Sequence, residues 1–365
     1  MIRLLAPIVL ITFFASGCAA TQAKQATETP EPVRLAAATP EKEPVVVKQL
    51  PQPKWIDGES KRYPRLDYMR SRAQAESAEK AKEMARAKLA KLFMVDTNAF
   101  DMSLHQAKIS ASHDEVDAFS TNEASIVAHA DIKTVLDKIE VADHWHNIES
   151  NTHHALAVLP RNTGKAFLRN EIRRLDKTTG DLIDQGQADG DSFSQLGMMA
   201  KAWRAQQVRS SLQKTMTRAD LTGRGMKPKW RLRDMEKDID SILKSLRIYP
   251  TGIEDDVNAP TMTHMLKGAL KVAELTPSDL SLADYIIRAA VDVSIIGEEN
   301  GWALGHGAIK VALSNKAEDA PRGSRQWELQ TPGLQEEHAM RRVMEKTEYM
   351  LKKNMRNILI DMAMN

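Results

Sequence analysis

The residues best suited to chemistry are four histidines that stand close together in the sequence: His144, His146, His153 and His154. Residues two apart on a β-strand point to the same face, about 6.5–7 Å from each other, so His144 and His146 would project together. If the next strand pairs with the first as a hairpin, His153 or His154 would approach them. Three neutral imidazoles around a shared centre would suit Zn²⁺ or Cu²⁺. The pattern therefore makes these four residues candidate metal ligands.

The surroundings of the histidines favour a plainer interpretation, a polar strand end and turn that happen to be rich in His. The nearby carboxylates are Asp143 and Glu149, no cysteine is close, and the chain contains no H-E-x-x-H motif. We therefore expect no bound metal, no cofactor and no catalytic residue. A metal-dependent hydrolase that uses the four histidines stays as the less favoured alternative.

Two other stretches invite comparison with ligand-binding motifs. Gly301, Gly305 and Gly307 are spaced rather like the glycines of phosphate-binding loops, but such loops open a helix after a strand. Here the glycines fall inside an expected hairpin, which predicts close backbone packing or a bulge. The basic stretch 224–233, RGMKPKWRLR, could touch an anionic polymer or lipid headgroups, although it also reads as a solvated helix start.

Cys18 is the only cysteine of the chain, and it ends a short hydrophobic leader. Arg3 gives the leader a positive start, and the stretch 4–14, LLAPIVLITFF, is apolar but too short to span a bilayer. Residues 15–18, Ala-Ser-Gly-Cys, resemble a bacterial lipobox, in which the thiol receives a diacylglycerol, the leader is cut before it and the new amino terminus is acylated. Several acyl chains give stable anchoring where one is marginal. The alternative is an ordinary signal peptide that ends near a cysteine.

This single cysteine also bears on the location that we expect. An exported chain with one thiol forms no internal disulfide, so its stability comes from packing. No later segment approaches the roughly 20 consecutive apolar residues of a membrane-spanning helix. Ala19 is not the Asp that retains many enterobacterial lipoproteins at the inner membrane. We therefore expect lipid anchoring in the outer membrane, with the body in the periplasm.

Length and charge narrow the class of protein. The chain has 365 residues and a formal net charge of +2, with both signs mixed along most of the expected helices. Such mixing is typical of solvated helix faces and argues against a nucleic-acid surface. A chain of this length usually forms two or three domains.

Composition and periodicity divide the chain into five segments. They are a signal peptide at 1–17, a lipid-anchored linker at 18–53, an α+β module at 54–185, a helical connector at 186–262 and a C-terminal α+β module at 263–365. The linker is rich in proline and has little to bury, so we expect it to be disordered. A flexible linker of that length reaches about 30 Å.

The first module is expected to pack a helix on a short antiparallel sheet. Its expected elements are a helix over 68–92, a strand beginning at Phe93, a loop over 110–123, strands over 135–145 and 154–159, and a helix over 164–182. The odd-numbered residues Val135, Ile139, Val141 and Trp145 are expected to share one strand face. The dipeptide 162–163, Asn-Thr, would cap the last helix.

The remaining segments repeat the combination of long amphipathic helices and strands. We expect helices over 196–217 and 230–247, strands over 285–295, 302–313 and 325–329, and a terminal helix over 334–362. Asn300-Gly301 is the strongest turn dipeptide in the chain and predicts a hairpin between the first two of these strands. The predicted fold class is therefore α+β, with two modules of antiparallel sheet joined by helices.

The first module resembles the LPP-twenty family of bacterial outer-membrane lipoproteins. The resemblance lies in Trp55-Ile56, Tyr63-Pro64, the alanine-rich run 75–93 (AESAEKAKEMARAKLAKLF) and the run 154–176 (HALAVLPRNTGKAFLRNEIRRLD), so it covers about residues 54–185. It implies a small α+β module on a lipid-anchored chain. Members of the family are envelope or surface lipoproteins, generally without an assigned enzymatic activity.

Together these features predict a non-enzymatic outer-membrane lipoprotein whose body acts as a binding or scaffold module. The expected partners are the membrane, through covalent lipid at Cys18, and other envelope proteins, with no nucleic acid. One alternative is an envelope assembly factor for a surface appendage or a cell-wall machine. The other is the metal-dependent hydrolase, which would then act in the periplasm.

Overall fold

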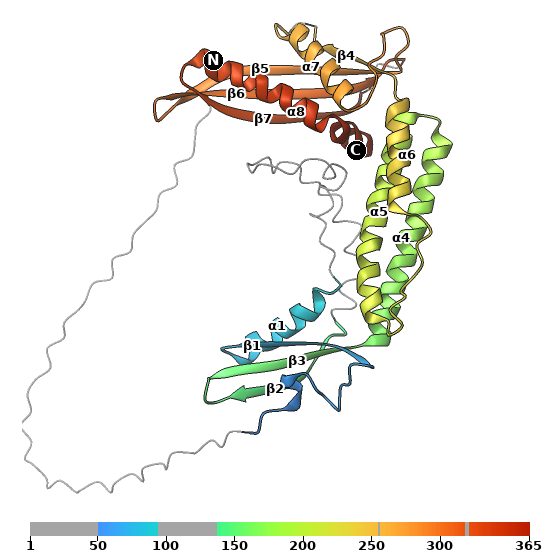
Figure 1. Cartoon of the computed structure of the whole chain (residues 1–365), viewed down its shortest axis with the longest axis vertical. Coiled ribbons are helices and arrows are strands. Elements are labelled where there is room, and N and C mark those ends of the chain that lie inside the picture. Colours follow the sequence, from blue (N-terminus) through green and yellow to red (C-terminus); the bar gives the residue numbers. More distant parts are fainter. Residues whose placement is uncertain (1–49, 94–136, 255, 318–320) are drawn as a thin grey trace, which may run out of the picture. The chain divides into compact units, whose positions relative to one another are not determined.

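The structure is a computed structural model that describes residues 50–93, 137–254, 256–317 and 321–365 (Figure 1). These residues belong to one compact unit, Gln49–Asn365. The leader, Cys18 and nearly all of the predicted linker lie outside the described residues. So do the loop predicted over 110–123 and the strand predicted to begin at Phe93, apart from Phe93 itself, which is a buried turn residue.

The described residues confirm the α+β class. A three-stranded antiparallel sheet comes first, with strand order β1-β3-β2. Its strands are β1 (Tyr68–Ala75), β2 (Glu140–Asn147) and β3 (Thr152–Pro160). Helix α1 (Ala78–Ala90) packs on one face through Ala81 and Ala85. On the other face, Trp55 from the short 3-10 helix η1 (Lys54–Asp57) packs with Leu156 and Val158 of β3.

The helix predicted over 68–92 is wrong in its first half. Residues Tyr68–Ala75 form β1, which pairs with β3, and the helix begins only after Ser77, whose side chain accepts a hydrogen bond from the Lys80 N–H. Met69 and Ser71 are buried toward α1, while Arg70 and Arg72 turn to the other face. That alternation is the period of a strand.

A β-bulge corrects the predicted face of the second strand. The pairing of β2 with β3 shifts register between Val141 and Asp143. Because one extra residue reverses the alternation, Val141 packs with the α1-side core while Trp145 packs on the opposite side with Trp55. Ile139 also belongs to the α1-side core, and Val135 lies outside the described residues.

Three helices follow: α4 (Arg161–Asp189), α5 (Ser192–Ala219) and α6 (Leu232–Ser245). The predicted cap at 162–163 is wrong, because α4 already begins at Arg161, directly after Pro160, and no side chain caps it. Gly190 ends α4 in the left-handed conformation, with φ of 75°. Asp191 caps α5 by accepting a hydrogen bond from the Phe193 N–H.

The second sheet has the strand order β4-β5-β6-β7. Its strands are β4 (Ile248–Gly252), β5 (Tyr285–Glu299), β6 (Trp302–Asn315) and β7 (Pro321–Gly333), and α7 (Ala259–Val272) and α8 (Glu336–Met364) contact it. The predicted hairpin is confirmed, and Asn300 and Gly301 both have positive φ, of 53° and 80°.

The second sheet is mixed, and not antiparallel as predicted. The short strand β4 runs parallel to β5, and it falls within the stretch 186–262 that we predicted to be helical. The boundaries predicted at 185 and 262 fall inside α4 and α7.

The predicted close packing is confirmed at Gly305 and Gly307 but not at Gly301, which has no neighbouring atom within 4 Å of its would-be Cβ. A Cβ atom on Gly305 would lie 2.8 Å from the carbonyl oxygen of Ala339 in α8, and one on Gly307 would overlap the Val343 side chain. These strand positions therefore let α8 lie directly against β6. Among the described residues, no helix has the length and apolar character that crossing a membrane requires.

Candidate functional site

Hairpin β2–β3 brings three of the four predicted histidines to one face. His146 is paired with His153, and His144 is paired with Ala155, two residues along the same two strands. His154 is paired with Trp145 on the other face, where the two rings lie 5.4 Å apart. The strand geometry thus confirms that His144 and His146 project together, and it selects His153 over His154 as their neighbour.

The three rings stack and do not surround a common point. The His146 and His153 rings lie 4.0 Å apart with an angle of 8° between their planes. His144 Nε2 lies 3.1 Å from His153 Nδ1, a hydrogen bond in which one ring donates and the other accepts. Ring lone pairs lie in the ring plane, so those of the stacked His146 and His153 rings do not meet at one point, and the His144–His153 hydrogen bond occupies one nitrogen of each of those two rings.

Burial and neighbouring charges lower the pKa of His144 and of His153 and so favour their neutral forms. Burial, then the charges of His153 and Lys82, lower the pKa of His144, against the opposite effect of Asp143. Burial and His146 lower the pKa of His153. A neutral imidazole is the form that binds a metal. Over the described ranges, however, no three His, Cys, Asp or Glu side chains are grouped so as to hold an ion.

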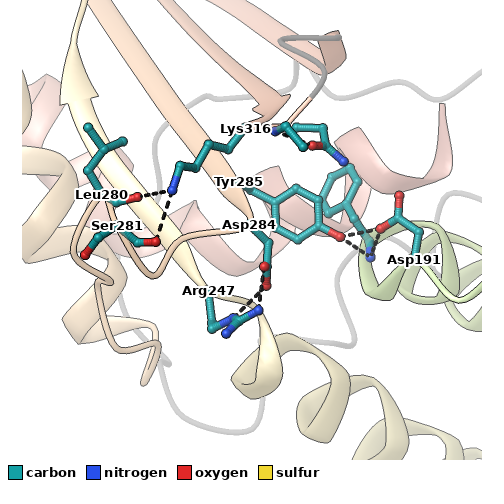
Figure 2. A network of polar contacts seen from close by, with 10 residues as sticks. Asp191, Arg247, Leu280, Ser281, Asp284, Tyr285 and Lys316 are labelled. Carbon is teal, nitrogen blue, oxygen red and sulfur yellow. Dashed lines mark hydrogen bonds and ion pairs between the residues drawn. The ribbon is translucent and has the colours of Figure 1, made fainter.

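A second polar group lies where the α4–α5 turn meets the second sheet, and Figure 2 shows it from close by. The Tyr285 hydroxyl, at the start of β5, donates a hydrogen bond to Asp191 Oδ1. It also accepts one from the Phe193 N–H at 3.2 Å. Arg322 of β7 pairs with Asp191 Oδ2 at 2.8 Å. This group joins the first turn of α5 to two strands of the sheet.

The neighbouring contacts fix the chain that enters β5. Arg247 donates two hydrogen bonds to the Asp284 carboxylate, at 2.8 and 2.6 Å (Figure 2). The Lys316 ammonium donates to the carbonyl oxygens of Leu280 and Ser281. Two segments distant in sequence are thus tied to the residues that precede Tyr285.

The pKa shifts in this second group point to a structural role. Burial and the hydrogen bond to Asp191 raise the pKa of Tyr285. Burial opposes ionisation of Asp191, but the hydrogen bonds from Tyr285 and Phe193 and the charge of Arg322 outweigh it and lower the pKa of the carboxyl. Both groups therefore titrate far from neutral pH, unlike an acid–base pair. The sequence signal that we missed was Gly190-Asp191, a helix end followed by a helix cap.

The basic stretch 224–233 precedes α6 and includes the first two residues of that helix. Trp230 is half-buried against the helical core, and Lys229 lies 4.3 Å from the centre of its ring. The tryptophan is thus partly used in packing. The rest of the stretch is largely exposed.

Comparisons with known proteins identify no family and only weakly similar structures. No protein-family model matches the sequence, and no curated protein matches it. One similar solved structure is a "putative lipoprotein" from Caulobacter crescentus, 13% identical with a TM-score of 0.24, covering 34% of this chain and 91% of that one. Another is a secreted protein from Helicobacter pylori, 14% identical with a TM-score of 0.32, covering 81% of this chain and 97% of that one.

TM-scores this low carry no argument about this chain. The resemblance to the LPP-twenty family therefore stays a prediction from the residues of the first module. The lipid attachment site at Cys18 also stays a prediction, because it lies outside the described residues.

Proposed function

We propose that this chain is a lipoprotein of the outer membrane whose folded body binds other envelope proteins without chemistry of its own. The observation that carries the proposal is Cys18, which follows a short apolar leader and the small residues 15–17. Acyl chains on the cysteine and on the new amino terminus bury enough methylene groups to hold a protein stably in a membrane. The folded body would then bind its partners while anchored to the membrane.

The proposed mechanism of partner binding is tethering to the membrane. A lipid anchor confines the body to a thin layer beside the membrane, which raises its effective concentration toward partners in the same layer. The predicted linker, 18–53, gives the body a reach of about 30 Å from the anchor. Binding of envelope partners then needs only modest intrinsic affinity.

The two polar groups of the body support a role without chemistry. The histidine rings are stacked, and within the described ranges they form no group of three side chains that could hold a metal ion. The Asp191–Tyr285 pair has pKa values shifted away from neutrality. Both arrangements stabilise the fold between strands or between a helix and a sheet, which is what a binding module requires of its scaffold.

Replacement of the predicted lipid-bearing thiol tests the proposal. In Cys18→Ser, we expect the protein to move from the membrane fraction to the soluble fraction while its circular dichroism stays unchanged. Ser16→Ala keeps a small residue in the lipobox and is the matched control, which should stay in the membrane. Mass spectrometry of the wild-type amino terminus should show a diacylglycerol and an amide-linked fatty acid. Retention of Cys18→Ser in the membrane after alkaline washing would contradict the proposal.

A further inference from the structure

Arginine side chains gather on the face of the first sheet that α1 does not cover. Arg70 donates to the carbonyl oxygens of Tyr63 and Gly58, both at 2.9 Å. Arg72, two residues further along β1, donates to the carbonyl oxygen of Ile56. Both guanidinium groups are thus held by the segment that crosses this face before β1 begins.

A third arginine reaches the same place from α4. Arg161 Nε donates to the carbonyl oxygen of Arg65 at 2.6 Å. Its Nη1 donates to the carbonyl oxygens of Arg218 and Ala219, at 3.0 and 3.2 Å. Arg161 therefore links the segment before β1 to the end of α5. We call Arg65, Arg70, Arg72 and Arg161 the arginine cluster.

Three side chains of the arginine cluster, those of Arg70, Arg72 and Arg161, are held by neutral groups only. Among the described residues, none of the four side chains of the arginine cluster forms an ion pair, and every hydrogen bond above ends on a backbone carbonyl. The carboxylates of the same segment, Asp57, Glu59 and Asp67, pair with none of them; Asp57 accepts from Gln52 instead. Burial and the charges of Arg65, Arg72 and Arg161 lower the pKa of Arg70, as expected where cations face one another.

We propose that the arginine cluster binds the phosphate group of an anionic ligand. A guanidinium group presents planar N–H donors that match phosphate oxygens, and it keeps its charge at any physiological pH. The carbonyl contacts hold Arg70 and Arg161 in place before a ligand arrives, which lowers the entropy cost of binding. A bound phosphate would supply the negative charge that no described carboxylate supplies to the arginine cluster.

Substitution of Arg65 can distinguish phosphate binding from a purely structural role of the arginine cluster. The other three arginines fasten backbone segments, so their loss would also disturb the fold. The Arg65 side chain makes no hydrogen bond or ion pair within the described ranges, and it is exposed beside Gly58. All of its N–H donors are left for a ligand.

Two sources of phosphate fit this position. The arginine cluster follows directly on the linker predicted over 18–53, so a phospholipid headgroup of the anchoring membrane lies within the reach of that tether. A small phosphate compound in solution has the same chemistry. The inference does not need the lipid anchor, and it is tested without it.

Binding is measured on the full chain carrying Cys18→Ser, so that no acyl chain contributes. The first probe is inorganic phosphate in isothermal titration calorimetry, against chloride at equal ionic strength. The second is co-sedimentation with phosphatidylcholine vesicles that contain phosphatidylglycerol, against vesicles of phosphatidylcholine alone. We expect heat of binding with phosphate, or retention on the anionic vesicles that falls as salt is raised. Vesicle binding that free phosphate displaces identifies a headgroup as the source, and phosphate binding alone identifies a soluble compound.

Arg65→Gln should weaken binding about fivefold, the loss expected for one arginine at an anionic surface. Arg65→Lys keeps the charge and should recover part of that loss. Arg86→Gln is the matched control. It removes the same charge, but Arg86 is exposed on α1, on the other side of the same sheet. If the Cys18→Ser chain binds neither probe, or if Arg86→Gln weakens binding as much as Arg65→Gln, the inference is wrong. Neither result touches the lipid anchor at Cys18, which the fractionation experiment tests separately.

Discussion

The first and second sheets each hold a helix close to their strands, but the first contact has alanines on its helix, whereas the second has glycines on a strand. In the first sheet the helix supplies alanines: Ala81 and Ala85 of α1 are fully buried against the strands. In the second sheet an inner strand supplies glycines, with Gly305 and Gly307 of β6 under α8. Small residues also stand opposite in both contacts, because Ala155 and Ala157 of β3 share the core with α1, and Ala339 of α8 meets Gly305.

The two sheets also differ in how their faces are covered. Residues 155–159 of β3 are all buried, because α1 covers one face and the segment with Trp55 covers the other. Strands β5 and β6 alternate between buried and less buried positions over most of their length. Burial on one face produces the alternation that identifies a strand in sequence, whereas burial on both faces removes it.

The largest expected effect comes from filling the contact on the strand side. Gly305→Val places carbon atoms where the Ala339 carbonyl already lies, and a helix backbone cannot move aside as a side chain can. We expect a loss of about 3 kcal/mol in the free energy of unfolding, at the upper end of the usual cost of overpacking. Urea unfolding followed by circular dichroism measures it.

Ala308→Val is the control for that substitution. Ala308 lies on the same strand with its side chain on the less buried face. Added methyl groups should change stability little there. Equal losses in the two variants would mean that β6, and not its contact with α8, is sensitive to larger side chains.

Filling the contact on the helix side should cost less. Ala85→Leu adds atoms between α1 and β1, where Ser71 donates a hydrogen bond to the Ala85 carbonyl oxygen. A helix of 13 residues can shift away from the strands, so we expect a loss of about 2 kcal/mol. Hydrogen exchange read by mass spectrometry should show faster exchange in α1, β1 and β3, with β5 and β6 unchanged.

Ala87→Leu is the matched control because Ala87 is exposed on the same helix. It should leave exchange as it is. Faster exchange in β5 and β6 of Ala85→Leu would show that the two sheets do not respond independently to packing defects.

The contrast between the two sheets also explains what could be predicted from sequence. In the second sheet, the alternation in β5, the Asn300-Gly301 turn and the close packing at Gly305 and Gly307 are local signals, and each is confirmed. Strand β4 was missed because it has five residues, contains Pro250 and depends on parallel pairing with a distant strand.

In the first sheet the local signals were misleading. Arg70 and Arg72 looked like the polar side of a helix. In the structure they lie on the sheet face opposite α1, and their guanidinium groups donate hydrogen bonds to backbone carbonyl oxygens. The histidines could be assigned to a common strand face, but ring stacking depends on side-chain packing, which spacing does not encode. The arginine cluster was invisible for the same reason: Arg161 reaches it from a separate helix.

The smallest expected effect concerns the histidines, which occur together only in the first sheet. Because the pKa values of His144 and His153 are lowered in the folded chain, the unfolded chain binds protons more readily near pH 6.5, the usual value for histidine. Their contribution to stability is therefore complete above that pH and declines as the pH falls toward the folded values. Lys82 adds to the repulsion of a charged His144, and Asp143 offsets part of it.

We expect β2 and β3 to open more readily at about pH 5.5 than at about pH 7.5, by less than either packing substitution causes. Protection factors from hydrogen exchange, corrected for the intrinsic pH dependence of the amides, measure this opening. His153→Gln removes the central ring of the stack and should reduce the difference between the two pH values. His264→Gln, at an exposed position of α7, should leave it as it is. If acid loosens β5 and β6 as much as β2 and β3, the histidines are not its cause, because the stack contacts only the first sheet.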